Sequence, residues 1–220
     1  MVSRKGNPVH GWVILDKPEG VTSSRAVGIV RRVFQAAKAG HGGTLDPLAT
    51  GILPIAFGEA TKTTSFAMQG SKSYSFTLAF GAQTQTDDRE GEIIHESDVR
   101  PGRDAIMALI PHFTGRIDQR PPIFSAIKVD GERLYAKARR GEEVIAPMRD
   151  VEVYSIQLDR FELPQVDFSI ECSKGTYIRS IAHDLGQRLE VGAHLSALRR
   201  TAVGRFRIED AWSLETLATE

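Results

Sequence analysis

The chain of 220 residues has a formal net charge of zero, with 41% hydrophobic and 25% charged residues, as is ordinary for a soluble globular protein of one large domain or two fused subdomains. A single cysteine excludes a disulfide framework within the chain, and the sequence shows neither an apolar leader nor an apolar run long enough to span a membrane, so we expect a cytoplasmic protein. Zero net charge also argues against a general binder of polyanions.

The first predicted elements are a strand and a helix. Residues 11–16 (GWVILD) are typical of a short buried strand, which the turn at residues 17–20 ends. Thr22 or Ser23 can cap the helix that follows, and we expect this helix to end at Gly40.

Apolar periodicity predicts the elements of the next part of the chain. After a loop at residues 40–51 comes an apolar segment, and then a short helix is expected at residues 61–68. Aromatic and apolar residues alternate with small polar ones over residues 73–80, which is the clearest strand pattern in the chain. A polar loop at residues 83–91 follows, with Asp87 and Asp88 at its tip.

The second half of the chain mixes strands and helices. Helices are expected at residues 105–110, 132–140 and 174–189, a hairpin of two strands at 151–163 and 166–172, and a basic strand at 201–208. Because strands come in runs as well as alternating with helices, we expect an α+β fold with a mixed, largely antiparallel sheet flanked by helices.

The loop at residues 40–51 (GHGGTLDPLATG) is the part of the chain richest in chemical signals. Three glycines in its first four positions allow backbone conformations, and a close approach of a ligand, that other residues bar. Asp46, which a proline follows in an otherwise uncharged loop, is a candidate nucleophile or base. On pattern alone, a surface turn that begins at Asp46 fits as well.

Other chemistries fit this loop poorly. A phosphate-binding loop of the Walker type requires a lysine, and the loop contains none. An aspartyl-phosphate enzyme with a second acid two positions after its nucleophile is excluded, because that position is Leu48. His10, His41 and Cys172 lack the paired spacing of metal ligands, so no metal site is expected.

Several separate motifs carry a resemblance to one family. GHGGTLDPLATGILP is similar to the signature of the bacterial TruB-type tRNA pseudouridine-55 synthases, in which the aspartate of G-T-L-D-P is catalytic. The blocks LDKPEGVTS, KSYSFTLAFGAQTQTDDREGEI, PPIFSAIKVDGERLYAKAR and CSKGTYIRSIAHDLG resemble the same family in the same order. The resemblance covers residues 11–206, and it implies a pseudouridine synthase fold.

The resemblance implies the chemistry and the residues that perform it. Pseudouridine forms when the N1–C1′ bond of a uridine breaks, the uracil turns, and C5 joins C1′, so no cofactor is expected. Asp46 is implied to be the nucleophile, or the base that starts the cleavage, and Arg179 its charged partner. Tyr74 is implied to stack on the target base and is a candidate to remove the C5 proton. On pattern alone, Arg179 also fits a surface charge and Tyr74 a core aromatic.

Further residues are implied to contact the RNA. His41 would contact the RNA loop near the place that the flipped base leaves, Tyr177 and Leu198 would line the pocket, and Asp88 would lie near the flipped nucleotide. Each also fits a plain core or loop role on pattern alone. Basic side chains near two parts of the sequence are expected to contact the RNA backbone, although solvated charged faces explain them equally well: Arg31, Arg32, Lys38, Arg199, Arg200 and Arg205.

The domain and the partner follow from the same resemblance. We expect a catalytic domain over residues 1–208 and a short tail at 209–220, without the RNA-binding PUA domain that many members carry. The expected substrate is the T-arm stem-loop of tRNA, modified at position 55 by a monomer with no membrane or obligatory protein partner. The main alternative is a tRNA-binding or tRNA-folding module without chemistry, against which the presence of Asp46 and Arg179 argues. A phosphate-transferring enzyme is disfavoured by the missing lysine and second acid.

Overall fold

The computed structural model describes residues 6–125, 127–129, 132–134, 140, 142 and 145–219, and the chain divides into two compact units. The first unit comprises residues 1–75 and 198–220, and the second comprises residues 76–197. Two strands, β4 (Lys72–Phe80) and β12 (Ala193–Val203), have residues in both units. No helix within the described ranges is both long and apolar enough to cross a membrane.

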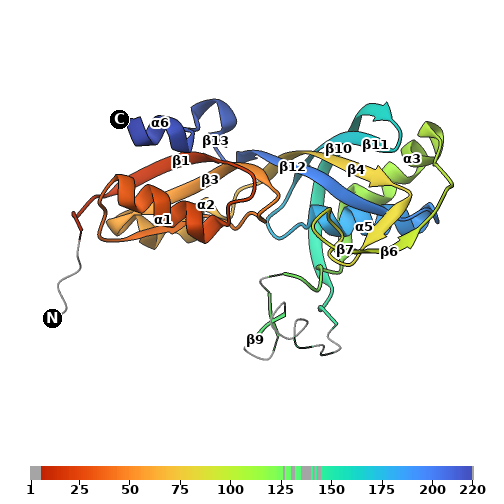
Figure 1. Ribbon diagram of the computed structural model, residues 1–220, viewed down its shortest axis with the longest axis horizontal. Coiled ribbons are helices and arrows are strands. Elements are labelled where there is room, and N and C mark those ends of the chain that lie inside the picture. Colours follow the sequence, from red (N-terminus) through yellow and green to blue (C-terminus); the bar gives the residue numbers. More distant parts are fainter. Residues whose placement is uncertain are drawn as a thin grey trace. The chain divides into compact units, whose positions relative to one another are not determined.

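The first unit is built on strands from both ends of the chain (Figure 1). Besides β12, its elements are β1 (Gly11–Lys17), α1 (Ser23–Val33), β2 (Ala39–His41), β3 (Thr50–Phe57), η1 (Gly58–Thr63), α2 (Thr64–Ala67), β13 (Phe206–Arg207), η3 (Ile208–Asp210) and α6 (Leu214–Thr219). Strand β3 pairs antiparallel with β1 and β2 and parallel with β12. The Thr22 hydroxyl accepts a hydrogen bond from the Arg25 amide, which caps α1 as expected.

An apolar core fixes the strands of the first unit in place. Leu15 and Lys17 of β1 are buried, and so are all residues of β3 except Thr50, as expected for a strand covered on both faces. Helix α1 packs on them through its one apolar face, and α6 contacts both α1 and β1. The buried residues of this cluster are Leu15, Ala26, Val30, Ala36, Leu53, Ile55, Phe57 and Leu217.

The second unit contains a larger sheet together with helices (Figure 1). Its strand order is β12–β4–β11–β10–β7, and two small hairpins pair β5 with β6 and β8 with β9. Besides β4 and β12, its elements are β5 (Ala82–Thr84), β6 (Ile93–Glu96), α3 (Arg103–Leu109), η2 (Ile110–Phe113), β7 (Gly115–Gln119), β8 (Lys128–Val129), β9 (Glu132–Arg133), β10 (Arg149–Glu162), β11 (Gln165–Cys172) and α5 (Ile178–Arg188).

Most of the predicted elements are confirmed. The alternation over residues 73–80 corresponds to β4, in which Phe76, Leu78 and Phe80 are buried, and Phe76 stacks on Phe168 of β11 at 5.3 Å between ring centroids. The expected hairpin corresponds to β10 and β11, which pair antiparallel. Among the strand pairs whose register the structure describes, β12 and β3 run parallel and the others run antiparallel. The α+β class with a largely antiparallel sheet is therefore confirmed.

Three element predictions need correction or fall partly outside the description. The first helix ends at Val33 and not at Gly40, because Gln35 takes a left-handed backbone (φ 47°) and residues 39–41 pair with β3. The basic strand expected at 201–208 is the end of the longer β12, which turns at Gly204 into β13. Of the helix expected at 132–140, the first two residues form β9, and residues 135–139 lie outside the described residues.

The segment expected as a tail is packed against the first unit. The Trp212 amide donates to the Ile14 carbonyl at 2.8 Å, and the Asp16 amide donates to the Trp212 carbonyl at 2.9 Å. Leu217 of α6 is 6% exposed. Residues 209–219 therefore pack on the first unit.

Candidate active site

Asp46 lies in the loop between β2 and β3, and hydrogen bonds fix the backbone of this loop next to it. The buried Ser23 hydroxyl donates to the Leu45 carbonyl at 2.9 Å and accepts from the Leu45 amide at 2.8 Å. The Asp46 carbonyl accepts from the Ala49 amide at 3.1 Å. Asp46 itself is half-buried, so its side chain is partly sheltered from water.

A buried lysine fixes the loop on the other side of Asp46. Lys17 is fully buried, and its Nζ donates to the carbonyls of Val21 at 2.7 Å and Pro47 at 3.3 Å. The Gly20 amide donates to the same Pro47 carbonyl at 2.9 Å. The lysine of the K-P-x-G turn thus connects the turn after β1 to the residue that follows Asp46.

Arg200 holds the part of the loop that precedes Asp46. It is 2% exposed, and its guanidinium donates to the carbonyls of Ile52 at 2.8 Å, Gly43 at 3.1 Å and Thr44 at 3.4 Å. This burial argues against the RNA-backbone contact expected from the sequence, because the guanidinium faces protein carbonyls and not solvent. We therefore exclude Arg200 from the candidate RNA contacts.

His41 lies at the end of β2, at the start of the same loop. Its Nδ1 is buried and has no hydrogen-bond partner among the described residues. Burial, with a smaller contribution from the positive charge of Arg200, holds the pKa of the imidazole below its ordinary value. His41 is therefore neutral at physiological pH.

Two further site residues belong to the first unit. Tyr74, near the start of β4, is half-buried, whereas Phe76, Leu78 and Phe80 on the same face are buried. Leu198 of β12 is 9% exposed, and its carbonyl accepts from the Thr50 hydroxyl at 3.5 Å. This hydrogen bond and the pairing of β12 with β3 place Leu198 beside the end of the Asp46 loop.

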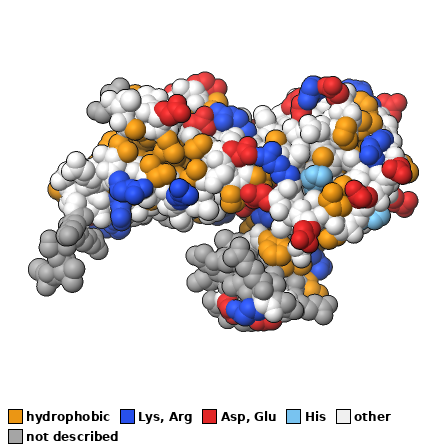
Figure 2. Space-filling model, in the orientation of Figure 1, with side chains coloured by type: hydrophobic (Ala, Val, Ile, Leu, Met, Phe, Trp, Pro, Cys, Tyr) orange, Lys and Arg blue, Asp and Glu red, His pale blue; other side chains and the backbone are white. Residues whose placement is uncertain are grey.

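The other basic residues expected at the RNA are on the surface of the first unit. Arg31, Arg32, Lys38 and Arg205 are exposed. Figure 2 shows Lys and Arg side chains over α1, next to a hydrophobic patch. Arg199 is partly exposed and forms a two-pronged ion pair with Asp16 at 3.0 Å and 2.7 Å, so only part of its charge is available to a phosphate.

In the second unit the structure brings together Arg179 and Asp88, two residues that sequence reasoning singled out separately. The Arg179 guanidinium lies 3.6 Å from the Asp88 carboxylate, and both side chains are about 95% buried, at 6% and 5% exposure. Arg179 also donates to the carbonyls of Thr86 at 3.2 Å and Phe124 at 3.1 Å. A buried pair of this kind holds its charges in a fixed direction.

Local hydrogen bonds fix both members of this pair. The Asp88 carboxylate accepts from the Thr86 hydroxyl at 2.6 Å and from the Glu90 amide at 3.1 Å, so Asp88 is not at a solvated loop tip. Half-buried Tyr177 precedes α5, and its backbone exchanges two hydrogen bonds with the buried Gln119 side chain, at 2.7 Å and 3.0 Å. Gln119 therefore fixes the start of the helix that carries Arg179.

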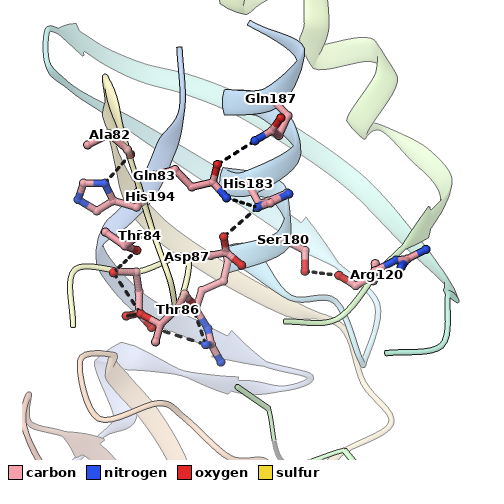
Figure 3. A network of polar contacts seen from close by, with 12 residues as sticks. Ala82, Gln83, Thr84, Thr86, Asp87, Arg120, Ser180, His183, Gln187 and His194 are labelled. Atoms are coloured by element: carbon pink, nitrogen blue, oxygen red, sulfur yellow. Dashed lines mark hydrogen bonds and ion pairs between the residues drawn. The ribbon is translucent and has the colours of Figure 1, made fainter. Parts of the chain in front are cut away.

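Sequence reasoning missed a polar network that supports the Asp88 loop (Figure 3). His183 of α5 contacts the Asp87 carboxylate at 2.9 Å and the Gln83 side chain at 3.3 Å, and Gln187 donates to Gln83 at 2.8 Å. Asp87 has a left-handed backbone (φ 59°), which a non-glycine residue adopts only when its surroundings hold it. No sequence signal links residues nearly a hundred positions apart, so only the fold reveals this pair.

The His183–Asp87 pair makes a testable contribution to stability. The hydrogen bond that the His183 ring donates to the Asp87 carboxylate raises the pKa of His183, so the stabilisation is fully present below the unfolded pKa of about 6.5 and is lost as pH rises through the folded pKa. We expect His183→Gln to lower the free energy of unfolding by less than about 1 kcal/mol at pH 5.5, because the pair is partly exposed, and by a smaller amount at pH 9. Urea denaturation at both pH values measures this difference.

The control is His112→Gln, at an exposed histidine of η2, which should change stability little at either pH. An equal effect of His183→Gln at both pH values would contradict the prediction.

Two known families match consecutive parts of the chain. Residues 31–178 match the family described as TruB family pseudouridylate synthase (N terminal domain). Residues 179–220 match the tRNA pseudouridylate synthase B C-terminal domain.

Individual relatives agree with the family match. The chain is 51% identical to tRNA pseudouridine synthase B of Brucella melitensis over 97% of this chain and 66% of the relative, and 53% identical to that of Caulobacter vibrioides over 97% and 69%. The chain thus spans about two thirds of the length of these curated relatives.

Solved structures share the fold. The crystal structure of a Cbf5-Nop10-Gar1 complex matches with a TM-score of 0.75 and 30% identity over 99% of this chain and 61% of the other. A structure of an H/ACA RNP bound to a substrate RNA containing 2′-deoxyuridine matches with a TM-score of 0.72 and 28% identity, over 100% and 59%.

Proposed function

The chain belongs to the TruB family of pseudouridine synthases, and from that premise we propose that it isomerises the T-loop uridine at position 55 of tRNA to pseudouridine, with Asp46 as the nucleophile. The main support for the proposal is the set of hydrogen bonds that hold the Asp46 loop in place. Three side chains, Lys17, Ser23 and Arg200, hold the backbone on both sides of one half-buried carboxylate. Such pre-organisation is what a reacting group requires.

The proposed reaction needs only groups that the chain itself supplies. The N1–C1′ bond breaks with the electron pair leaving on the uracil, which turns and forms a C5–C1′ bond. The C5 proton then leaves to a base, and N1 gains a proton, so that the product has the composition of the substrate. Asp46 is proposed to react as the ionised carboxylate, and Tyr74 to stack on the base and to take the C5 proton.

Arg179 has a proposed role in keeping Asp46 ionised, which the resemblance to the family implies. Arg179 enters the proposal as the cation for this carboxylate, and Asp88 fixes the guanidinium through the buried pair at 3.6 Å. Tyr177 and Leu198 would line the pocket around the uracil. Burial supports this assignment. The Arg179 side chain is shielded from water, and its contacts with two carbonyls and one carboxylate fix the orientation of its guanidinium.

The proposed RNA contacts follow from exposure and charge. The target uridine must leave the stack of its loop, at a cost of a few kcal/mol. His41, neutral and with its Nδ1 unsatisfied, is proposed to contact the RNA where the base has left. Exposed basic residues, namely Arg31, Arg32, Lys38, Arg205 and in part Arg199, are proposed to contact backbone phosphates, which makes binding depend on salt.

Release of tritium from C5 tests the function. A tRNA transcript labelled with [5-³H]uridine should release the tritium of one uridine per tRNA molecule on incubation with the chain, because C5 loses its hydrogen when it bonds to C1′. A matched transcript with cytidine at position 55 should release none. Binding without any release would show a tRNA-binding module and would refute the enzyme, whereas equal release from both transcripts would refute the T-loop target.

A further inference from the structure

Arg200 is a buried cation that no described carboxylate neutralises within ion-pair distance. Its guanidinium is 2% exposed, and all its polar contacts within the described ranges are the backbone carbonyls of Ile52, Gly43 and Thr44. Burying a charge without an opposite charge costs free energy, which the hydrogen bonds of the buried group must offset. The neighbouring Arg199, by contrast, pairs with the Asp16 carboxylate and is partly exposed.

Glycines stand at two positions where the chain passes close to Arg200. Gly51 pairs with Arg200 between β3 and β12, and a Cβ at Gly51 would lie 2.2 Å from the Arg200 carbonyl oxygen. Gly43, whose carbonyl binds the guanidinium, has φ +105°, a backbone conformation that residues with a side chain rarely adopt. Gly43 lies in the loop that carries Asp46 and Gly51 in the strand that follows it, so glycines allow the backbone on both sides of Arg200 to take its shape.

We propose that Arg200 is a positioning residue for the reaction, which fixes the Asp46 loop from its upstream side so that the carboxylate stays aimed at the target uridine. Gly43 and Thr44, whose carbonyls it binds, are the third and second residues before Asp46. Ser23 binds Leu45 and Lys17 binds Pro47, and Arg200 adds a side-chain constraint on residues 43 and 44. The inference rests on the proposed role of Asp46 in the reaction.

A second effect of Arg200 can be measured without any reaction. Its positive charge adds to burial in lowering the pKa of His41, at the start of the same loop. Removing this charge should raise the pKa of His41, and a lysine in its place should keep it low. Arg200 would then position the loop and also keep a neutral imidazole next to the RNA.

The experiment compares Arg200→Met, Arg200→Lys and the wild-type chain. For Arg200→Met we expect kcat with saturating tRNA to fall about 100-fold, since a small misplacement of a reacting group has an effect of that size, while the Kd for tRNA changes less than about threefold. Arg200→Lys retains a cation but cannot donate to all three carbonyls in the geometry of a guanidinium. Its kcat should therefore be about tenfold higher than that of Arg200→Met. Val166→Ala, a cavity-forming change in β11 of the second unit, controls for loss of stability and should leave kcat within about twofold of wild type at a temperature well below unfolding.

Hydrogen exchange of the Leu45 amide and NMR titration of His41, assigned with His41→Gln, complete the test. In Arg200→Met we expect the Leu45 amide, which donates to Ser23, to lose protection and the pKa of His41 to rise. Unchanged kcat, or unchanged Leu45 protection in a folded Arg200→Met chain, would overturn the positioning role. If the wild-type chain released no tritium, the proposed function would fail, but the exchange and titration results would still decide whether Arg200 fixes the loop.

Discussion

Asp46→Asn is expected to lower kcat for pseudouridine formation by at least about 10⁴-fold while the Kd for tRNA stays near the wild-type value. Asparagine has nearly the same shape, and the hydrogen bonds that hold this loop run to its backbone through Ser23, Lys17 and Arg200. The substitution therefore removes the reacting carboxylate and leaves its surroundings in place. Tritium release under single-turnover conditions and filter binding of the same tRNA measure the two quantities.

A matched substitution separates the loss of this carboxylate from a general effect of charge. Asp118→Asn changes an exposed aspartate of β7, and it should leave both kcat and Kd close to wild type. Full activity of Asp46→Asn would refute the mechanism. Loss of tRNA binding in parallel with activity would instead make Asp46 a binding residue.

Arg179→Met should have the second-largest effect, and it should reduce both stability and turnover. Truncating one partner of a buried ion pair leaves the other charge uncompensated, so we expect the free energy of unfolding to fall by roughly 3–5 kcal/mol. Because the guanidinium is also the proposed partner of Asp46, kcat should fall by at least about 100-fold. Urea denaturation and tritium release measure the two effects.

The double variant Arg179→Met/Asp88→Asn separates the two roles of the arginine. Neutralising Asp88 removes the uncompensated charge and should recover part of the lost stability, since the Thr86 hydroxyl and the Glu90 amide can still bond to the asparagine oxygen. Turnover should stay low, because the cation for Asp46 is still missing. Recovery of turnover together with stability would show that Arg179 acts only in the fold.

The elements with strong local patterns were predictable from sequence. The alternation of β4 and the hairpin of β10 and β11 follow from apolar periodicity and from the proline between the two strands. The end of α1 was not predictable, because its residues favour continuing the helix. The pairing of residues 39–41 with β3 decides the boundary, and that is a contact distant in sequence.

The site residues that belong to a sequence motif were predictable. The residues whose role depends on being buried were not. Asp46 stands in a glycine-rich loop that the sequence alone singles out. Arg200 and Asp88, as charged residues, favour the surface on average, yet one is 2% and the other 3% exposed. Each is buried because its partners, the carbonyls of the Asp46 loop and the guanidinium of Arg179, come from distant parts of the chain.

The support of the site by His183 has the same origin. Histidine has no preference that would place it opposite Asp87, and the pair exists because α5 passes beside the loop between β5 and β6. Such supporting contacts are fixed by tertiary structure alone.

A crystal structure of the chain bound to a T-arm stem-loop RNA tests the central claim most directly, namely that Asp46 meets a uridine that has left its stack. We predict that position 55 is flipped out, that C1′ or C6 of that uridine lies about 3–3.5 Å from an Asp46 carboxylate oxygen, and that the Arg179 guanidinium donates to the same carboxylate. A uridine still stacked in its loop, or Asp46 and Arg179 facing separate surfaces of the complex, would contradict the account.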